Sequence, residues 1–171
     1  MTGRGLLVRR ARAEDAPAAS EVLCASITRL CRADHGDDPK VIAGWVANKT
    51  PDWVRRMIGD ETGMVFVAER GGRIVGVGMI GELDPAAGKG AVLLNYVDPT
   101  DRGTGVSTAV LAHMELQMQG QGVRRAHLVS TRTARRFYEK AGWQAVITDR
   151  QGGPVEGVPM EKWLTPAGLA R

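Results

Sequence analysis

The sequence lacks any apolar run approaching the roughly 18 residues that a membrane-spanning helix needs, and its basic N-terminus lacks the apolar stretch of a signal peptide. It also lacks a strong charge imbalance, since 23 Lys and Arg residues against 19 Asp and Glu residues leave a net charge of +4. That imbalance is too small to indicate nucleic-acid binding by itself. We therefore expect one cytoplasmic domain over residues 1–171, with neither a membrane nor a nucleic acid as its partner.

Cysteine is scarce, and the two that are present, Cys24 and Cys31, fall on what reads as one helix. Seven positions along a helix amount to about two turns, or ~10 Å. A disulfide needs Cα atoms within about 7 Å of each other, so we expect two free thiols of the kind buried in cytoplasmic proteins. The three histidines, His35, His113 and His127, are scattered, and no Cys or His spacing suits zinc, so we expect no metal site.

Hydrophobic residues make up 43% and charged residues 25% of the chain, which is the balance of a folded globular domain. Hydrophobic periodicity and turn residues divide the chain into elements. Helices are predicted over Glu14–Leu30, Val41–Val46, Pro51–Ile58, Val106–Met118 and Ala134–Ala141. Strands are predicted over Leu6–Arg10, Met64–Glu69, Arg73–Leu83, Ala91–Val97, Ala126–Val129, Gln144–Thr148 and Pro159–Leu164. This order indicates a mixed α/β (α+β) fold, with a mixed, largely antiparallel central sheet and helices on both faces.

Some segments give more specific expectations. Arg32–Pro39 is polar and reads as a loop, whereas Ala91–Val97 is nearly continuously apolar and reads as a strand buried on both faces. Val106–Met118 is apolar nearly all round, so we expect this helix to be deeply packed. Gly76, Gly78 and Gly81 weaken the strand that contains them and predict a close approach by another backbone.

The most informative stretch is the turn-rich loop Asp98–Ser107, between a strand and a helix. Gly103 and Gly105 allow a tight turn with positive φ, in which backbone N–H groups converge. The helix that follows adds unpaired N–H groups and the positive end of its dipole. With the Arg102 guanidinium, these groups predict a cradle for an anion such as a pyrophosphate. The dinucleotide-binding fingerprint fits less well because Thr108 stands where its third glycine would be.

Two stretches resemble signatures of the GNAT superfamily of N-acetyltransferases. Val97-Asp98-Pro99, Arg102-Gly103-Thr104-Gly105-Val106 and Leu111 resemble its coenzyme-A motif, Arg/Gln-x-x-Gly-x-Gly/Ala. Ala134 to Trp143 resembles its second signature, Ala-x-x-Phe-Tyr-x-x-x-Gly-aromatic, and the order of elements follows the family's fold along nearly the whole chain. The chain departs from the family's pattern at Ser107, where Gly or Ala is usual, and at Thr131, where Asn is common.

The resemblance implies a GNAT-like acyl-CoA N-acyltransferase that moves an acetyl group from acetyl-CoA to a primary amine by direct attack in a ternary complex. It implies an acceptor amine on a small molecule or a protein, and a monomer or homodimer. The loop residues that would hold the pyrophosphate are Arg102, Gly103, Thr104, Gly105, Val106 and Ser107. The backbone that would pair with the coenzyme arm is that of Asn95, Tyr96 and Val97, splayed from the next strand, with a further contact at Thr131. A strand N–H would polarise the thioester carbonyl, and Tyr138 would protonate the departing thiolate.

Several alternatives stay open. The proton acceptor for the amine is Glu82, Asp84, Asp34, His35 or a water chain. The alternative function is a catalytically degenerate module that binds acyl-CoA for regulation or interaction, suggested by the two departures from the family pattern. Two structural alternatives also stay open: Tyr138 is a core residue, and the glycine loop is an ordinary strand-to-helix turn.

The acceptor is not encoded in a motif. The loops that would shape its pocket are Arg32–Lys40, Asp84–Gly90 and Arg150–Gly157, and their acids would suit a cationic amine. The Asp34-His35 pair is either functional or a solvated or capping pair, and Arg135 or Arg136 either is a solvated surface residue or contacts the 3′-phosphate of coenzyme A.

Overall fold

A computed structural model describes residues 5–147 and 156–164 of the chain. Within these residues, seven strands form one sheet in the order β1-β2-β3-β4-β5-β7-β6, and neighbouring strands are antiparallel except β4 and β5. The strands are β1 (Leu6–Arg10), β2 (Met64–Arg70), β3 (Arg73–Asp84), β4 (Lys89–Val97), β5 (Arg125–Ser130), β6 (Gln144–Ala145) and β7 (Val158–Trp163). The helices are α1 (Ala16–Leu30), α2 (Arg32–His35), α3 (Pro39–Val46), α4 (Pro51–Gly59), α5 (Val106–Gly120) and α6 (Arg135–Lys140), with 3₁₀ turns η1 (Ala13–Asp15) and η2 (Pro99–Asp101).

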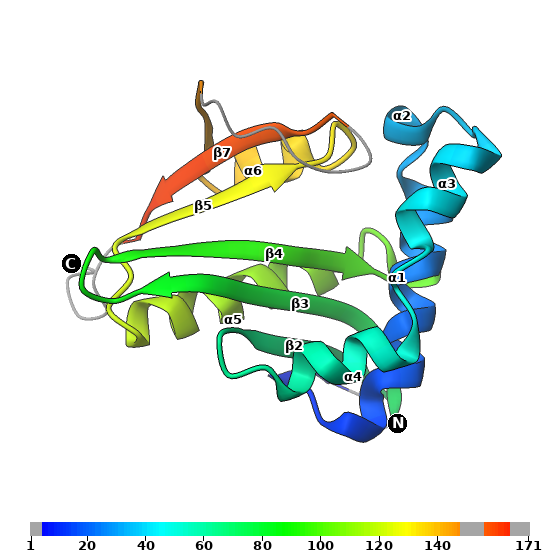
Figure 1. The fold of residues 1–171 in the computed structure, drawn as a ribbon, viewed down its shortest axis with the longest axis horizontal. Coiled ribbons are helices and arrows are strands. Elements are labelled where there is room, and N and C mark those ends of the chain that lie inside the picture. The colour runs from blue at the N-terminus through cyan, green and yellow to red at the C-terminus, as the bar shows by residue number, and fades with distance from the viewer. Residues whose placement is uncertain (1–4, 148–155, 165–171) are drawn as a thin grey trace.

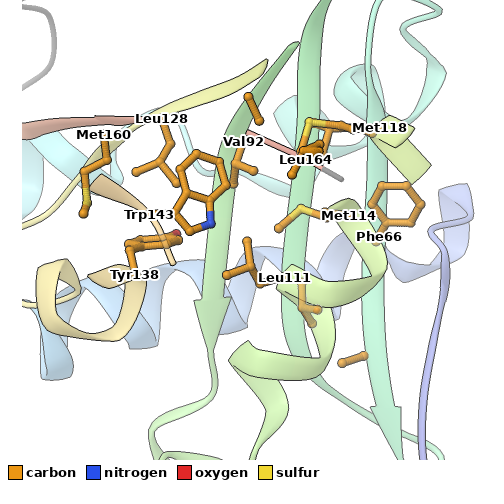
Figure 2. Packing of buried hydrophobic residues seen from close by; sticks show 14 of the residues in the cluster. Phe66, Val92, Leu111, Met114, Met118, Leu128, Tyr138, Trp143, Met160 and Leu164 are labelled. Carbon is orange, nitrogen blue, oxygen red and sulfur yellow. The ribbon is translucent and has the colours of Figure 1, made fainter. Parts of the chain in front are cut away.

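Helices cover both faces of the sheet, which confirms the predicted fold class. In Figure 1, α5 runs behind the sheet, while α4 lies in front of it and α1 stands at the end of the strands. The face under α5 and α6 holds the larger buried cluster, and Figure 2 shows Tyr138 and Trp143 inside it near Met160. Burying each such side chain stabilises the fold by about 1.5–3 kcal/mol. The elements that frame the site are therefore parts of the main core.

Two glycines of β3 let α5 approach the sheet closely. A Cβ at Gly76 would lie 2.6 Å from a methyl group of Val106, and one at Gly78 would lie 2.5 Å from a methyl group of Val110. The close approach predicted at these glycines is real, but it comes from helix side chains and not from another backbone. Because Val106 is the first residue of α5, this contact fixes the position of the helix N-terminus.

The parallel strands β4 and β5 separate after a short paired segment. Pairing joins Lys89–Ala91 to Arg125–His127, and no further pairing joins these two strands within the described residues. The expectation that β4 is buried on both faces is therefore wrong for its second half. Leu93 is 43% exposed, and Asn95 and Tyr96 are only partly buried, because the neighbouring strand has turned away.

Two further expectations are corrected. Arg32–Pro39 is not a loop, because α2 forms one helical turn there and α3 begins at Pro39. The buried His35 ring accounts for this turn, since its Nε2 lies 3.0 Å from the Ile27 carbonyl oxygen and its Nδ1 accepts a hydrogen bond from the Asp37 N–H. α5 does not pack on all sides, since Leu116 on its outer face is 56% exposed.

The remaining predictions concern thiols, metals and membranes. Cys24 and Cys31 are free thiols, as predicted. In the described ranges, no group of three or more His, Cys, Asp or Glu side chains is arranged to hold a metal ion. Nor does any helix there have the length and hydropathy to cross a membrane. The end of the strand predicted to Thr148, and most of the predicted loop Arg150–Gly157, lie outside the described residues.

Candidate functional site

A buried carboxylate holds the loop between β4 and α5. Asp101 is only 6% exposed, and it accepts hydrogen bonds from Arg70 at 2.7 Å and from Arg73 at 2.6 Å. Arg70 also donates to the Thr104 hydroxyl at 2.9 Å, and that hydroxyl donates to the Asp101 carbonyl oxygen. Charge-assisted hydrogen bonds of this kind are the strong ones. They anchor the loop to the β2–β3 hairpin immediately before α5 begins.

Two glycines in left-handed conformations then lead the backbone into α5. Gly103 has φ +76° and Gly105 has φ +87°, a region in which an L residue is strained by about 1–2 kcal/mol. Gly105 is the N-cap, and no side chain of the described residues caps it. The first N–H groups of α5 and the positive end of its dipole therefore face the loop. This backbone has the geometry expected of an anion cradle.

A cavity of about 290 Å³ extends from this loop to α6. Its walls come from the end of α1, the second half of β4, the glycine loop, the start of α5, and α6. The lining residues are Ser26, Leu30, Cys31, Asn95, Tyr96, Val97, Asp101, Arg102, Gly103, Gly105, Val106, Ser107, Thr108, Thr131, Thr133, Ala134, Phe137 and Tyr138. Of the coenzyme-binding and catalytic residues that the resemblance implied, all are in this set except Thr104, whose hydroxyl is used inside the loop.

A second, smaller cavity of about 50 Å³ lies between the diverging strands β4 and β5. It shares five lining residues with the first cavity: Asn95, Tyr96, Thr131, Ala134 and Tyr138. Both cavities therefore meet at the second half of β4 and at α6. The separation of the strands, which the resemblance implied, creates this opening in the sheet.

Tyr138 is both a core residue and a wall of the two cavities. It is 6% exposed, and its ring packs edge to face on Phe137 and Trp143. Burial raises the pKa of Tyr138 well above its usual value, and the nearby Asn95 side chain opposes that rise. The phenol consequently keeps its proton throughout the physiological pH range.

Two other titratable groups of the cavity wall are also held in their neutral forms. Burial raises the pKa of Tyr96, and a hydrogen bond with the Trp45 side chain opposes this rise. Burial raises the pKa of the Cys31 thiol to about 12. Since the thiolate is the reactive form of cysteine, Cys31 is not a nucleophile at neutral pH.

The loop before α6 is tied to α2 by Asp34. The Asp34 carboxylate accepts a hydrogen bond from the Arg132 N–H at 2.6 Å and another from the Thr133 hydroxyl at 2.6 Å. Of the two interpretations of the Asp34-His35 pair, the structure supports a capping role for the carboxylate and a core role for the buried ring. Thr131 Oγ1 accepts from the Ala134 N–H at 3.1 Å, so this side chain is used inside the turn.

The candidate proton acceptors do not line the larger cavity. Glu82 lies 2.8 Å from Nε2 of His127, and Asp84 accepts a hydrogen bond from the Ala87 N–H. Asp34 caps the loop before α6, and His35 is only 3% exposed. Of these four described candidates, none belongs to the cavity wall, so no base is assigned.

The acids that were expected to favour a cationic amine have other partners. Asp37 pairs with Arg32, Asp38 caps α3, and Glu156 pairs with Arg132. Arg135 pairs with Glu139 four residues on, as a solvated helix residue does. These contacts give the acids partners within the chain, and the preference for a cationic amine stays a prediction.

Sequence reasoning missed two contributions to the site. Asp101 reads as one more polar turn residue, because the arginines that bind it lie 28 and 31 residues earlier in the chain. The wall formed by the end of α1, with Ser26, Leu30 and Cys31, reads as an ordinary amphipathic helix. No local signal in the sequence distinguishes either contribution from a structural one.

Comparisons with known proteins agree with this geometry. The PaiA N-acetyltransferase of Thermoplasma acidophilum, solved in complex with coenzyme A, superposes with a TM-score of 0.78 at 17% identity, over 93% of this chain and 99% of that one. A GCN5-related N-acetyltransferase from Rhodopseudomonas palustris gives 0.79 at 20% identity, over 96% and 99%. The ribosomal-protein-S18-alanine N-acetyltransferase of Escherichia coli gives 0.63 at 16% identity, over 98% and 99%.

The solved structures establish a shared fold at these identities, and no protein of curated function matches the sequence. The family itself comes from the sequence. A family model described as an acetyltransferase (GNAT) domain matches residues 33–164, which include the glycine loop, α5 and α6. The chain therefore belongs to the GNAT acetyltransferases.

Proposed function

We propose that this protein transfers an acetyl group from acetyl-CoA to a primary amine, by direct attack within a ternary complex, with Tyr138 as the general acid. The observation that supports this most strongly is the continuity of one cavity from the glycine loop to Tyr138. A loop suited to an anion at one end and a buried, protonated phenol at the other are the groups that a phosphorylated thioester would need. A simple turn and a core residue would not need to share one cavity.

The glycine loop would hold the pyrophosphate. Backbone N–H groups at Gly103, Gly105 and the start of α5 would bind its oxygens, and Arg102 would add a cation on the cavity wall. A Cβ at either glycine would meet no other atom within 4 Å, which leaves the loop open to a ligand. Ser107 is small enough to preserve this approach.

The separated strand β4 would hold the coenzyme arm. Backbone groups of Asn95, Tyr96 and Val97 line the cavity beyond the last β4–β5 pair, where they are available to an extended ligand. One N–H of this strand would polarise the thioester carbonyl. Thr131 Oγ1 accepts the Ala134 N–H in the turn, and its hydroxyl hydrogen would donate to the coenzyme arm.

Acetyl-CoA, when bound, would supply the thioester acetyl group and a thiolate leaving group. Tyr138 Oη would deliver a proton to the departing sulfur, and its raised pKa ensures that the proton is present at neutral pH. The acceptor would be an amine of a small molecule or a protein. Solvent would take the amine proton, since the carboxylates that were candidates are engaged elsewhere.

The second candidate is a module that binds acyl-CoA without turnover. One observation favours it: Thr131 stands where Asn is common in the family, and its hydroxyl oxygen already accepts the Ala134 N–H. Measured turnover with any amine rejects this candidate, whereas ligand binding with no release of coenzyme A across an amine panel supports it.

Thermal shift with acetyl-CoA tests the binding half of the proposal. Ligand at about one hundred times its Kd stabilises a protein by about 2.7 kcal/mol, or roughly 5–10 °C for a domain of this size. Gly105→Glu places a carboxylate and a strained φ in the cradle, and we expect it to abolish the shift. Gly120→Glu, at the other end of α5 with open space around it, is the matched control and should keep the shift. No shift in a wild-type protein that melts cooperatively would refute the proposal.

A further inference from the structure

We infer that Glu115 is a positioning residue for Tyr138: its carboxylate fixes the indole of Trp143, and that indole packs against the Tyr138 ring. This inference rests on the proposed function, in which Tyr138 is the general acid. Tyr138 lines both cavities described above, whereas Glu115 and Trp143 line neither. Glu115 would therefore act on the reaction only through its contacts inside the core.

Trp143 contacts Tyr138 through both its ring and its backbone. The Trp143 ring is 2% exposed and meets the Tyr138 ring edge to face, with the ring centroids 6.0 Å apart. The Trp143 N–H also donates to the Tyr138 carbonyl oxygen at 3.0 Å. Figure 2 shows the two rings beside each other in the core. Because the core is close-packed, a shift of the indole either moves the phenol or leaves a gap beside it.

Glu115 holds the indole of Trp143 in place. The Trp143 Nε1–H donates to Glu115 Oε1 at 2.9 Å. This N–H is the one polar group of the ring, so the bond decides how far the ring can slide or tilt. Glu115 lies on α5, about 13 Å along the helix axis from Val106, the first residue of that helix.

The position of Glu115 on α5 relates the two ends of the site to each other. The N-terminus of α5 belongs to the cradle that would hold the pyrophosphate, and α6 carries Tyr138. The bond from Trp143 to Glu115 ties the end of α6 to α5, so it sets where the phenol lies relative to that cradle. A proton donor must lie within hydrogen-bond reach of the departing sulfur, and a misplacement of about 1 Å can lower the rate by about 10².

Lys162 holds the same carboxylate from β7. Its Nζ donates to Glu115 Oε2 at 2.7 Å, and the two side chains are only 23% and 17% exposed. Stability alone gives little reason for such a pair, since apolar residues of similar volume often serve the fold as well. A carboxylate bound at both oxygens has one orientation, and this orientation directs Oε1 at the indole.

The test is Glu115→Leu, with Tyr138→Phe and the wild type assayed beside it at a temperature where all three are folded. We expect kcat to fall about fivefold, because the indole and the phenol are no longer held in place. The KM for acetyl-CoA should stay within about twofold, because the glycine loop and β4 are unchanged. Trp143→Phe keeps a ring beside Tyr138 and removes the indole N–H, and it should lower kcat by a similar factor.

Two combined variants test whether Glu115 acts through the indole. Glu115→Leu together with Trp143→Phe should be no slower than the slower single variant, since both changes break the same link. Glu115→Gln together with Lys162→Met leaves an amide oxygen for the indole and removes the ammonium that would compete for it. We expect this second pair to keep kcat within about twofold of the wild type, although its melting temperature should fall.

Val67→Ala is the control for stability, because Val67 is fully buried on the opposite face of the sheet. It should lower the melting temperature and leave kcat unchanged. A purely structural role for Glu115 predicts instead that Glu115→Leu behaves like this control.

The outcomes separate the inference from the proposed function. If Glu115→Leu does not fold, Trp143→Phe and the pair of Glu115→Gln with Lys162→Met carry the test. Wild-type kcat in the folded Glu115→Leu or Trp143→Phe variant, while Tyr138→Phe is impaired, overturns this inference alone. So does a Glu115→Gln and Lys162→Met protein with a kcat about fivefold below the wild type. Absence of turnover in the wild type overturns the proposed function, and the inference with it.

Discussion

Asp101 is the residue on which the order of the glycine loop depends most. The change that tests this is Asp101→Asn, which keeps the shape of the side chain and removes its charge. The carboxylate is 8% exposed and binds Arg70 at 2.7 Å and Arg73 at 2.6 Å. An asparagine there turns an NH₂ group toward at least one guanidinium, so both the charge and one hydrogen bond are lost.

The size of the effect follows from the exposure of the two partners. A hydrogen bond to a charged group contributes about 1.5–3 kcal/mol when it is buried. Arg70 is 30% exposed and should retain most of that contribution, whereas Arg73 is 56% exposed and should contribute about 0–1 kcal/mol, as surface pairs do. The sum is roughly 2–4 kcal/mol, or about 5–15 °C in Tm for a domain of this size.

The assay combines melting with binding. We expect Asp101→Asn to lower Tm by that amount and to weaken acetyl-CoA binding about tenfold, since the loop must then be ordered at the moment of binding. Arg73→Gln is the matched control and should lower stability by less than about 1 kcal/mol. A Tm within about 2 °C of the wild type, together with unchanged affinity, would refute the view that Asp101 holds the loop.

Two other predictions concern stability. Burial raises the pKa of Cys31 to about 12 and also raises those of Tyr96 and Tyr138. The unfolded chain releases these protons first, near pH 8.5–10, so the free energy of unfolding is highest below about pH 8.5. Above that pH it falls by about 1.4 kcal/mol per pH unit for each group that has ionised in the unfolded chain. A urea midpoint that stays constant between about pH 8 and pH 11 would contradict this prediction. Asp34→Ala should lower Tm by about 2–5 °C, through loss of its bonds to the loop before α6, while Asp37→Ala, in an exposed pair, should not; equal Tm changes in the two variants would argue against this role for Asp34.

Local patterns predicted those parts of the molecule that depend on local physics. Positive φ at Gly103 and Gly105, the helix that follows them and the positions of most strands are consequences of residues a few places apart. The backbone conformation of the glycine loop was therefore foreseeable from its own segment. The partial exposure of the second half of β4 was not foreseeable, because it depends on where β5 turns away from β4.

The contacts that fix the site are distant in sequence, which is why no pattern revealed them. Asp34 reaches the Thr133 hydroxyl across 99 positions, and Asp101 reaches back to the β2–β3 hairpin. The Asn95 contact with Ser107 joins a strand to the helix packed on it. In each case a polar residue that looks like a solvated or capping residue in the sequence acquires its partner only when the sheet and helices assemble.

The measurement that tests the central claim most directly is the release of coenzyme A thiol by wild type and Tyr138→Phe, with saturating acetyl-CoA and a panel of primary amines. Removing a general acid should lower kcat by about 10²–10⁴. The KM for acetyl-CoA should change by less than about threefold, and Tm should not fall, because phenylalanine fills the same space. Amine-dependent turnover in the wild type, lost in this way, is the predicted result. Equal kcat in the two proteins, or no amine-dependent thiol release by the wild type, would contradict the account.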